Sequence, residues 1–341
     1  MPSDVASDVG EDPGTAEAMP RSWQVSRLGT PEEALRLERR PAREPGPGEV
    51  RVRVEAVGLN HPDLLLCTGR YQERPELPFV PGFEAAGEVV SVGPGSVRRV
   101  DERVVVIPEL PEGALQESLT VPDAQTYPVP DTMPVTTAAV LHIAYTTAHA
   151  ALHHRAGLRS GERLLVTGAA GGVGSAAVQL GKAAGAYVVA LASGAAKADA
   201  CRELGADQVL DPYDPHLDER VRALGGADVA LDVVGGVLFD RVRRSLAFEG
   251  RLVTLGFAGG TVPQAPVNHV LLRTYSLIGL HLATYRRENP DLLRNIHAEL
   301  VDLAASGVVA PRMTELPFDQ APAALGLLAG REVIGRVVLR V

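Results

Sequence analysis

The chain has 341 residues and a net charge of −9 at pH 7, and it is 45% hydrophobic but only 4% aromatic. Its length suits two domains better than one. The acidic balance argues against nucleic acid as the main partner, because phosphate binding needs a basic face. No apolar run approaches the roughly 18 residues of a membrane span, and no secretory signal precedes the first strand, so we expect a cytoplasmic protein with no membrane partner.

The N-terminal segment is expected to stay outside the folded domains. Residues 1–20 contain five acidic side chains and no Lys or Arg, and most of the other residues are small or polar. Such a segment has too little apolar surface to offset the entropy of ordering it. We therefore expect a disordered acidic extension over residues 1–20.

The next part of the chain is predicted to be rich in β-structure. Polar and apolar residues alternate at 23–25 and strongly at 50–57, as in half-buried strands. Further strands are expected at 88–92 and 103–107. Frequent prolines punctuate the region too often for long helices. We therefore predict a β-rich, partly barrel-like domain that begins at residue 21 and ends near residue 140.

From residue 141 the pattern changes to alternating strands and helices. The predicted strands are apolar and hardly alternate, which indicates a parallel sheet covered by helices on both faces. They are expected at 163–168, 187–192, 208–210, 228–234, 251–255 and 276–282. This predicts a doubly wound α/β domain over 141–285. The remaining residues, 286–341, are too few for a core of their own and are expected to return to the first domain.

A turn dense in small residues follows the strand at 163–168. The spacing is Ala169-x-Gly171-x-x-Gly174, and an amphipathic helix predicted over 172–185 leaves the turn. A helix N-terminus after such a turn offers unpaired N–H groups to a pyrophosphate. A plain strand–helix turn is the alternative, but the strand–turn–helix context that the motif needs is present. The predicted cofactor contacts in this turn are Ala170, Gly171, Gly172, Val173 and Gly174.

The sequence after the second strand of this domain indicates which dinucleotide binds. NAD enzymes place Asp or Glu there, about 20 residues past the glycines, to bind the ribose 2′-hydroxyl. Here the strand ends Leu191-Ala-Ser-Gly194 without an acid, and Lys197 is the first basic residue. A hydroxyl and an ammonium suit a 2′-phosphate. A solvated helix lysine is the alternative for Lys197 alone, but the missing acid favours NADPH.

Ordered motifs along the chain resemble the zinc-independent medium-chain dehydrogenase/reductases, in particular the NADPH:quinone oxidoreductases and their enoyl-reductase relatives. The resemblance covers residues 21–341 and implies a GroES-like catalytic domain interrupted by a Rossmann domain. The motifs are Gly58-Leu-Asn-His-Pro-Asp63, Gly69-Arg-Tyr-Gln72, Leu77-Pro-Phe-Val-Pro-Gly-Phe-Glu84, Tyr145-Thr-Thr-Ala148, the glycine turn, Asp232-Val-Val-Gly-Gly236 and Gly335-Arg-Val-Val-Leu339.

The same resemblance argues against a metal. Zinc-dependent relatives carry a cysteine where this chain has Asn60 and a histidine where it has Phe83. An amide is a poor zinc ligand and a phenyl ring is none. The two cysteines lie far apart in sequence and are expected to be reduced thiols. His149 and His153 would share a helix face, but we expect no carboxylate or cysteine partner near them.

The resemblance also implies the site residues. Ser193, Lys197 and Tyr213 match contacts to the 2′-phosphate, and Asn60 and Thr147 match positions near the nicotinamide. Tyr71 matches a proton donor or enolate stabiliser of enoyl-thioester reductases, with a cleft-wall tyrosine as the alternative, and Asn60 is the second catalytic candidate. Further cofactor contacts are expected at Val234, Gly235, Gly256, Phe257 and Arg336, where Arg336 replaces the family's lysine.

The function predicted from these features is hydride transfer from NADPH to a quinone or an α,β-unsaturated carbonyl. The alternatives are an enoyl-thioester or polyketide-type tailoring reductase and a non-enzymatic RNA-binding or structural relative, since a fold does not fix a function. The strand at 276–282 resembles the edge through which such proteins pair, so a homodimer is expected.

Overall fold

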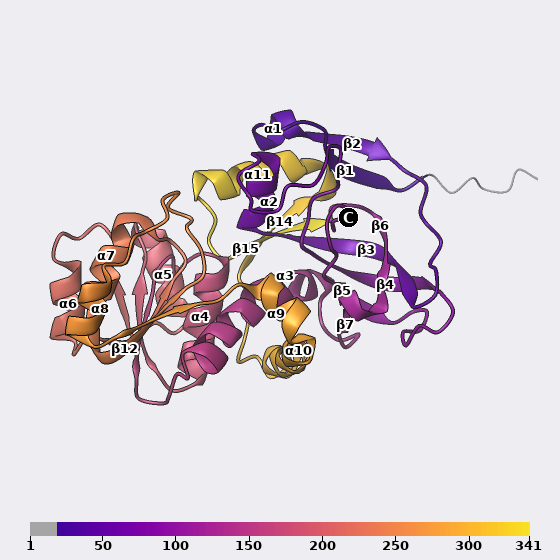
Figure 1. Ribbon diagram of the computed structural model, residues 1–341. Helices are drawn as coiled ribbons and strands as arrows, with labels where there is room; N and C mark the ends of the chain where they lie inside the picture. The colour runs from indigo at the N-terminus through magenta and orange to yellow at the C-terminus, as the bar shows by residue number, and fades with distance from the viewer. Residues whose placement is uncertain (1–18) are drawn as a thin grey trace, which may run out of the picture.

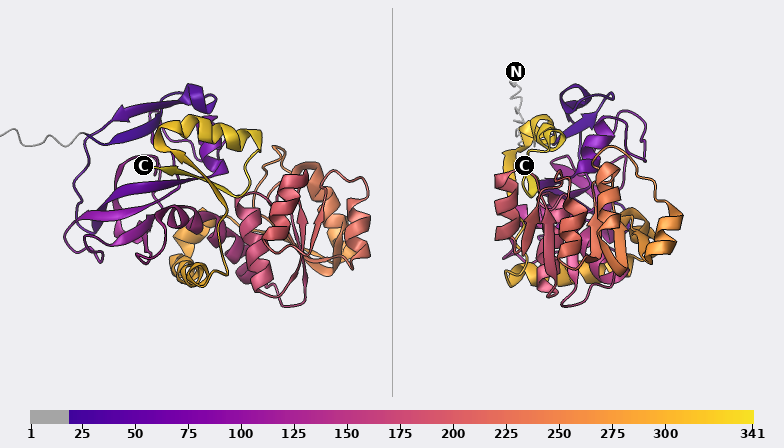
Figure 2. Two further views of the ribbon diagram at one scale, coloured as in Figure 1. Left: turned by 180° about the vertical axis from the view of Figure 1, so that it is seen from behind. Right: turned by 90° about the vertical axis from the view of Figure 1, so that its left-hand side faces the viewer.

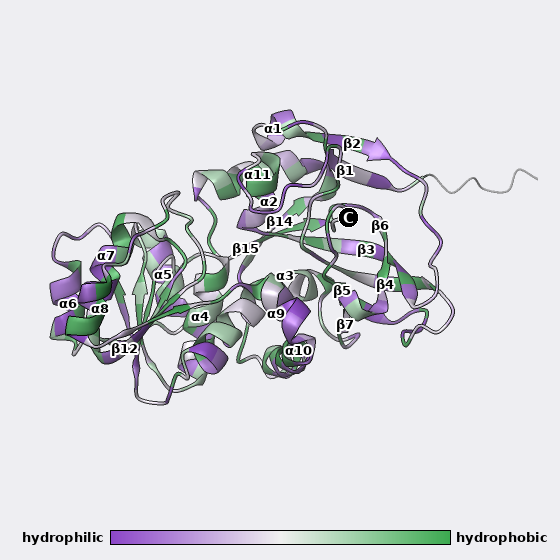
Figure 3. Ribbon diagram, viewed as in Figure 1, coloured by the Kyte–Doolittle hydropathy of each residue, from purple (hydrophilic) through white to green (hydrophobic). Residues whose placement is uncertain are grey.

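The computed structural model describes residues 19–341, so nearly all of the expected acidic extension lies outside the described residues. The described chain forms two lobes, each built around its own sheet (Figures 1 and 2). Apolar residues concentrate on the strands at the centre of each lobe (Figure 3). This is the predicted pairing of a β-rich domain with a doubly wound domain. The residues at which the chain crosses between the lobes, expected near 140 and 285, stay a prediction.

One lobe contains a six-stranded, wholly parallel sheet in the order β10-β9-β8-β11-β12-β13. Its strands are β8 (Arg163–Val166), β9 (Tyr187–Leu191), β10 (Gln208–Leu210), β11 (Ala227–Asp232), β12 (Leu246–Thr254) and β13 (Ser276–Gly279). Its helices are α4 (Gly172–Ala183), α5 (Ala195–Glu203), α6 (Leu217–Ala223), α7 (Gly236–Arg244) and α8 (Val267–Arg273). The chain crosses from β10 to β11 past β9 and β8, so a topological switch point lies at the end of β8, where such sheets bind ligands.

The other lobe combines both ends of the chain. Its seven-stranded sheet has the order β14-β15-β3-β4-β5-β7, with β6 paired to β3, and a β1–β2 hairpin beside it. The strands are β1 (Arg21–Val25), β2 (Leu35–Arg39), β3 (Glu49–Leu59), β4 (Glu84–Val92), β5 (Arg103–Val106), β6 (Ser118–Pro122), β7 (Thr126–Pro128), β14 (Met313–Pro317) and β15 (Arg336–Arg340). Because β15 pairs with β3, with Val338 opposite Gly58, the C-terminal tail returns as expected.

Helices join the lobes and complete them. The long α3 (Val135–His149) is almost entirely buried and continues as a π-helical turn, Ala150–Arg155. Its alanines belong to a core that takes residues from both sheets, which explains the Ala-rich sequence of this segment. The others are α1 (Pro31–Ala34), α2 (His61–Cys67), α9 (Leu282–Glu288), α10 (Pro290–Ala305) and α11 (Ala321–Gly330), with 3-10 turns at Asp123–Gln125 and Phe318–Gln320.

Two features differ from the sequence analysis. The strand expected at 276–282 ends at Gly279, because His281 becomes the N-cap of α9. The short strands β2, β6 and β7 were not predicted; they lack a long alternating pattern and are defined by their pairing partners. Within residues 19–341 no helix has the length and apolar character to cross a membrane.

Candidate active site

The glycine turn between β8 and α4 is built for close backbone approach. A Cβ on Gly174 would lie 2.2 Å from the Gly168 carbonyl oxygen, and Gly168 itself has a positive φ of 57°. Gly171 caps α4 without a side-chain hydrogen bond. Within the described chain, the N–H groups of Gly172, Val173 and Gly174 have no acceptor. These donors and the positive end of the helix dipole fit a pyrophosphate.

The turn after β11 forms the neighbouring rim. Asp232 is fully buried, and its carboxylate accepts hydrogen bonds from the Thr167 hydroxyl (2.8 Å) and from the amides of Val234 (3.0 Å) and Gly235 (3.1 Å). The ring of Phe257 lies against Gly235, where a Cβ would be 2.9 Å from Phe257 Cδ1. The structure therefore brings the predicted residues Val234, Gly235 and Phe257 together.

A second basic residue, Arg331, lies close to Lys197 in space, and the sequence analysis missed it. The Lys197 ammonium donates to the backbone carbonyl of Arg331 at 2.6 Å. The Arg331 guanidinium donates in turn to the Ala258 carbonyl at 2.9 Å. Arg331 follows α11 with a positive φ of 56°. Arg331 lies in a short Gly-Arg-Glu stretch, 134 residues from Lys197 in the sequence. No local pattern therefore predicts that the two residues are close.

The other predicted contacts to the 2′-phosphate are less closely grouped. Ser193 is the second residue after β9 and precedes Gly194, the N-cap of α5, which has a φ of 79°. Tyr213 is 74% exposed and its amide donates to Asp211 within a turn. Ser193 and Lys197 thus lie at the start of α5, whereas no side-chain contact ties Tyr213 to them.

The C-terminal strand brings a buried cation beside the glycine turn. The amide of Gly335 donates to the Ala170 carbonyl at 2.7 Å. The guanidinium of the next residue, Arg336, forms an ion pair with Glu84 and donates to Asn60 Oδ1 at 2.8 Å. A Cβ on Gly172 would lie 3.1 Å from Arg336 Nη1. Arg336 therefore touches both the cofactor cradle and the predicted catalytic amide.

These contacts determine what Asn60 can do. Its Nδ2 group donates to Glu84 Oε1 (3.0 Å) and to the Gly58 carbonyl (3.3 Å), so both amide protons are used. Its Oδ1 accepts from Arg336 and keeps one lone pair. The Thr147 hydroxyl donates to the Ile143 carbonyl at 2.6 Å and is left as an acceptor. Asn60 and Thr147 are therefore acceptors, not donors, for a ligand.

The charged side chains around Asn60, which are Glu84, Asp63 and Arg336, are buried. Burial raises the pKa of Glu84, and this is opposed by Arg336 and by the Ile143 amide, which donates to Oε2 at 2.9 Å. Burial also raises the pKa of Asp63 to about 7. The Asp63 carboxylate accepts from the backbone amide of Asn60 at 2.7 Å and so caps the start of α2. Cap and ion pair together fix the backbone and side chain of Asn60.

Tyr71 has a hydroxyl that is free to bind a ligand. Its ring meets Phe83 edge to face at 5.4 Å between centroids, and its side chain is buried. The hydroxyl has no hydrogen-bond partner among residues 19–341. Burial raises the pKa of Tyr71 to about 12, so the phenol remains protonated at neutral pH. It can therefore donate a hydrogen bond to a ligand.

The histidines of α3 require one correction. His149 Nε2 lies 3.2 Å from Glu299 on α10, so the expectation of no carboxylate partner was wrong. The partner comes from a helix 150 residues later in the sequence, which spacing on α3 cannot reveal. Over the described range, no group of three or more His, Cys, Asp or Glu side chains is arranged to hold a metal ion.

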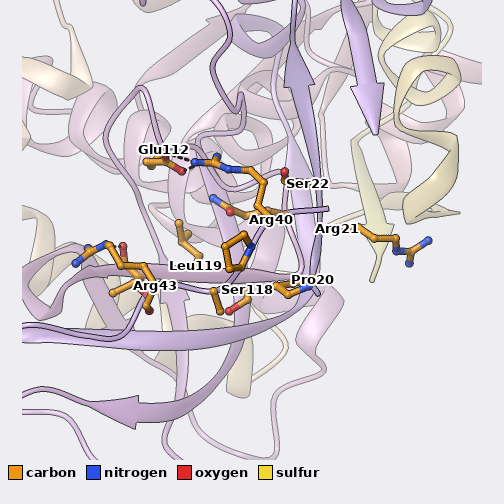
Figure 4. Close-up of a pocket in the computed structure, with 12 residues that line it drawn as sticks. Pro20, Arg21, Ser22, Arg40, Arg43, Glu112, Ser118 and Leu119 are labelled. Atoms are coloured by element: carbon orange, nitrogen blue, oxygen red, sulfur yellow. Dashed lines mark hydrogen bonds and ion pairs between the residues drawn. The ribbon is translucent and has the colours of Figure 1, made fainter. Parts of the chain in front are cut away.

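A distinct hollow lies on the GroES-like lobe. It has a volume of about 140 Å³, and an Arg40–Glu112 ion pair of 3.0 Å crosses it (Figure 4). Its walls come from β1, β6 and the segment after β2, and none of the predicted site residues lines it. The hollow is therefore separate from the glycine turn.

Comparison with known proteins agrees with this geometry. The family model described as an alcohol dehydrogenase GroES-like domain matches residues 46–131, and the one described as a zinc-binding dehydrogenase matches residues 172–298. Quinone oxidoreductase-like protein 2 of Bos taurus is 34% identical over 325 residues, which cover 94% of this chain and 93% of that protein. Its homolog in Nematostella vectensis is 34% identical and covers 86% and 82%.

The chain belongs to the quinone oxidoreductase family. Its fold is that of the zinc-independent medium-chain dehydrogenase/reductases. A mycobacterial protein solved in complex with NADPH has a TM-score of 0.88 and 32% identity, covering 94% of this chain and all of that chain. The Escherichia coli quinone oxidoreductase, also in complex with NADPH, has a TM-score of 0.87 and 26% identity with the same coverage. Gly335-Arg336 stands where the resemblance in the sequence implied Gly-Lys.

Proposed function

We propose that the protein is an NADPH-dependent oxidoreductase that reduces a quinone or an α,β-unsaturated carbonyl without a metal. The observation that carries the proposal is the hydrogen bond from Gly335 to Ala170 (2.7 Å). It fixes the glycine turn, with its free N–H groups, next to Arg336 and Asn60. A dinucleotide on this turn would reach the amide and the tyrosine side of the cleft. The NADPH complexes of two similar proteins support this choice of cofactor.

The residues present fit NADPH. The free amides of the glycine turn would hold the pyrophosphate. Ser193, Lys197 and Arg331 would surround the 2′-phosphate, and both cations are tied only to carbonyl oxygens, which a phosphate can replace. Tyr213 would join them only if its turn moved. When bound, NADPH supplies the hydride, and the chain supplies orientation and charge stabilisation.

The residues near the reacting groups would have different roles, because some can only accept a hydrogen bond from a ligand and one can donate. Asn60 and Thr147 offer acceptor oxygens and would orient a donor such as the nicotinamide carboxamide or a ribose hydroxyl. Tyr71 offers a donor and would hold the carbonyl oxygen of the substrate as negative charge develops on it. Asn60 would thus act by positioning, and Tyr71 would touch the reacting group.

Turnover tests the proposal directly. Oxidation of NADPH is followed at 340 nm with a panel of quinones and enones, and product formation is checked for each acceptor. We expect reduction of at least one member of either class, with none in the absence of enzyme. NADPH binding without oxidation across both classes would contradict the proposal and favour a non-enzymatic relative.

We also propose a homodimer formed through the edge strand β13. Its backbone has no partner strand on one side within the described chain, and exposed edges of this kind invite pairing. The adjoining helix α8 has no buried residue and exposes Val267, Leu271 and Leu272 by more than three quarters. A dimeric mass by light scattering at micromolar concentration is expected. A monomeric mass would refute the dimer.

A further inference from the structure

Arg286 on helix α9 makes a contact across the junction between the lobes. Arg286 Nη1 donates to the carbonyls of Ile107 (3.3 Å) and Pro108 (3.5 Å) at the end of β5. Its Nη2 lies 3.8 Å from Glu109, beyond hydrogen-bond distance. The side chain is 25% exposed. Among residues 19–341, Nε and Nη2 therefore have no hydrogen-bond acceptor.

The position of Arg286 is tied to that of Tyr71. Ile107 and Pro108, whose carbonyls hold Arg286, follow β5, the strand that pairs with β4, and Phe83, the residue just before β4, packs on the Tyr71 ring. At the other end of α9, His281 Nε2 lies 3.2 Å from Gln72 Nε2, directly after Tyr71. Burial raises the pKa of Tyr71, and the charge of Arg286 opposes that rise. Helix α9 thus lies against the segment that carries Tyr71, and Arg286 is close enough for its charge to act on the phenol.

The free edge of the guanidinium has a chemical preference. Because Nη1 is held by backbone carbonyls, the side formed by Nε and Nη2 is left for a ligand. Two parallel N–H groups on this side match the two oxygens of a carboxylate. Glu109, which is 64% exposed, already approaches this side without completing a hydrogen bond, and an exposed side chain is readily displaced.

The geometry points to Arg286 as a specificity-determining residue that binds a carboxylate on the acceptor substrate, while Tyr71 holds its carbonyl oxygen. This assignment rests on the proposed reductase function and narrows its substrate class to carbonyl compounds with a carboxylate. Glu109 then competes with the substrate for the same guanidinium.

A matched pair of acceptors tests the assignment. The free acid and the methyl ester of 4-oxopent-2-enoic acid differ in one charge. With saturating NADPH we expect the wild type to favour the acid at least tenfold in kcat/KM. The variant Arg286→Gln should lose this preference through KM, Arg286→Lys should keep part of it, and Glu109→Gln should lower KM for the acid. The matched control is Arg287→Gln, a 72% exposed neighbour paired with Glu288, which should change nothing.

A binding measurement separates this inference from the proposed reaction. Calorimetry with 4-oxopentanoate, which has no carbon–carbon double bond to accept the hydride, is carried out on the NADP⁺-loaded protein. We expect the wild type and Arg287→Gln to bind it at least tenfold more tightly than Arg286→Gln, whether or not any acceptor is turned over. Equal affinities in wild type and Arg286→Gln, or an unchanged acid-to-ester ratio in the variant, would overturn the role of Arg286. Tight binding of the acid without any turnover would instead count against the reductase.

Discussion

The guanidinium of Arg336 and the carboxylate of Glu84 form an ion pair at 5% and 0% side-chain exposure. Removing two charges from water is costly, and hydrogen bonds must replace the lost hydration. Ile143 and Asn60 donate to the carboxylate, and Asn60 Oδ1 accepts from the guanidinium. Each charge therefore depends on the other, and the predicted catalytic amide depends on both.

Removing the guanidinium should destabilise the fold strongly. The variant Arg336→Met leaves Glu84 buried without its cation, which costs about 3–5 kcal/mol. Urea unfolding followed by circular dichroism measures the loss. The matched control is Arg340→Met, which breaks a 62% and 37% exposed pair with Glu315 and should move the midpoint little. Equally small effects of the two substitutions would show that the buried pair is not needed for the fold.

A methyl group in the glycine turn should abolish cofactor binding. In Gly174→Ala the new Cβ would meet the Gly168 carbonyl at 2.2 Å, so the turn must shift and its amides lose their alignment. We expect NADPH affinity, measured by calorimetry, to fall more than tenfold. Gly326→Ala on α11 is the control, because its Cβ meets only the flexible end of Glu32. If the NADPH affinity of Gly174→Ala is unchanged, the pyrophosphate does not bind at this turn.

The sequence was informative where a function imposes a local pattern and uninformative where distant segments meet. The strand–turn–helix order around the glycine turn and the return of the C-terminal tail were both predicted, and the structure confirms both. Arg331 beside Lys197 and Glu299 beside His149 depend on how lobes and helices pack. No periodicity or motif records such contacts, and the strand expected at 276–282 was drawn three residues too long because the N-cap of α9 follows an apolar run.

A buried histidine pair should make the protein less stable in acid. His297 Nε2 donates to the Pro128 carbonyl (3.1 Å), so its Nδ1 accepts from His142 Nδ1 (3.1 Å), and a further proton would place two N–H groups face to face. Burial lowers the pKa of His297 to about 4. The unfolded state therefore binds more protons below about pH 6.5, and stability falls by about 3 kcal/mol as the pH drops towards 4.

The pH dependence of unfolding checks this assignment. Urea unfolding of wild type and His297→Gln is compared between pH 7.5 and 4.5, and the variant should lose less stability over that range. His216→Gln, a substitution in an exposed ion pair with Glu219, serves as the control. If wild type and His297→Gln show the same slope, protonation of this pair does not govern the acid response.

The Tyr71 hydroxyl should affect the reaction more than the binding of NADPH. Removing a positioned proton donor in Tyr71→Phe should lower kcat about 100-fold while leaving NADPH affinity unchanged. Since the pKa of Tyr71 is about 12, the wild-type rate should show no titration of this group between pH 6 and 10. If Tyr71→Phe keeps the full kcat, Tyr71 does not donate a proton and has the alternative role considered for it, that of a residue lining the site.

Calorimetric titration with NADPH and NADH tests the central claim, recognition of the 2′-phosphate by the start of α5 and Arg331. The wild type should bind NADPH at least tenfold more tightly than NADH, and Lys197→Met should remove most of that difference without weakening NADH. The control Lys182→Met, at an ion pair with Asp207 on the far end of α4, should keep the preference. Equal wild-type affinities for the two dinucleotides would contradict the account.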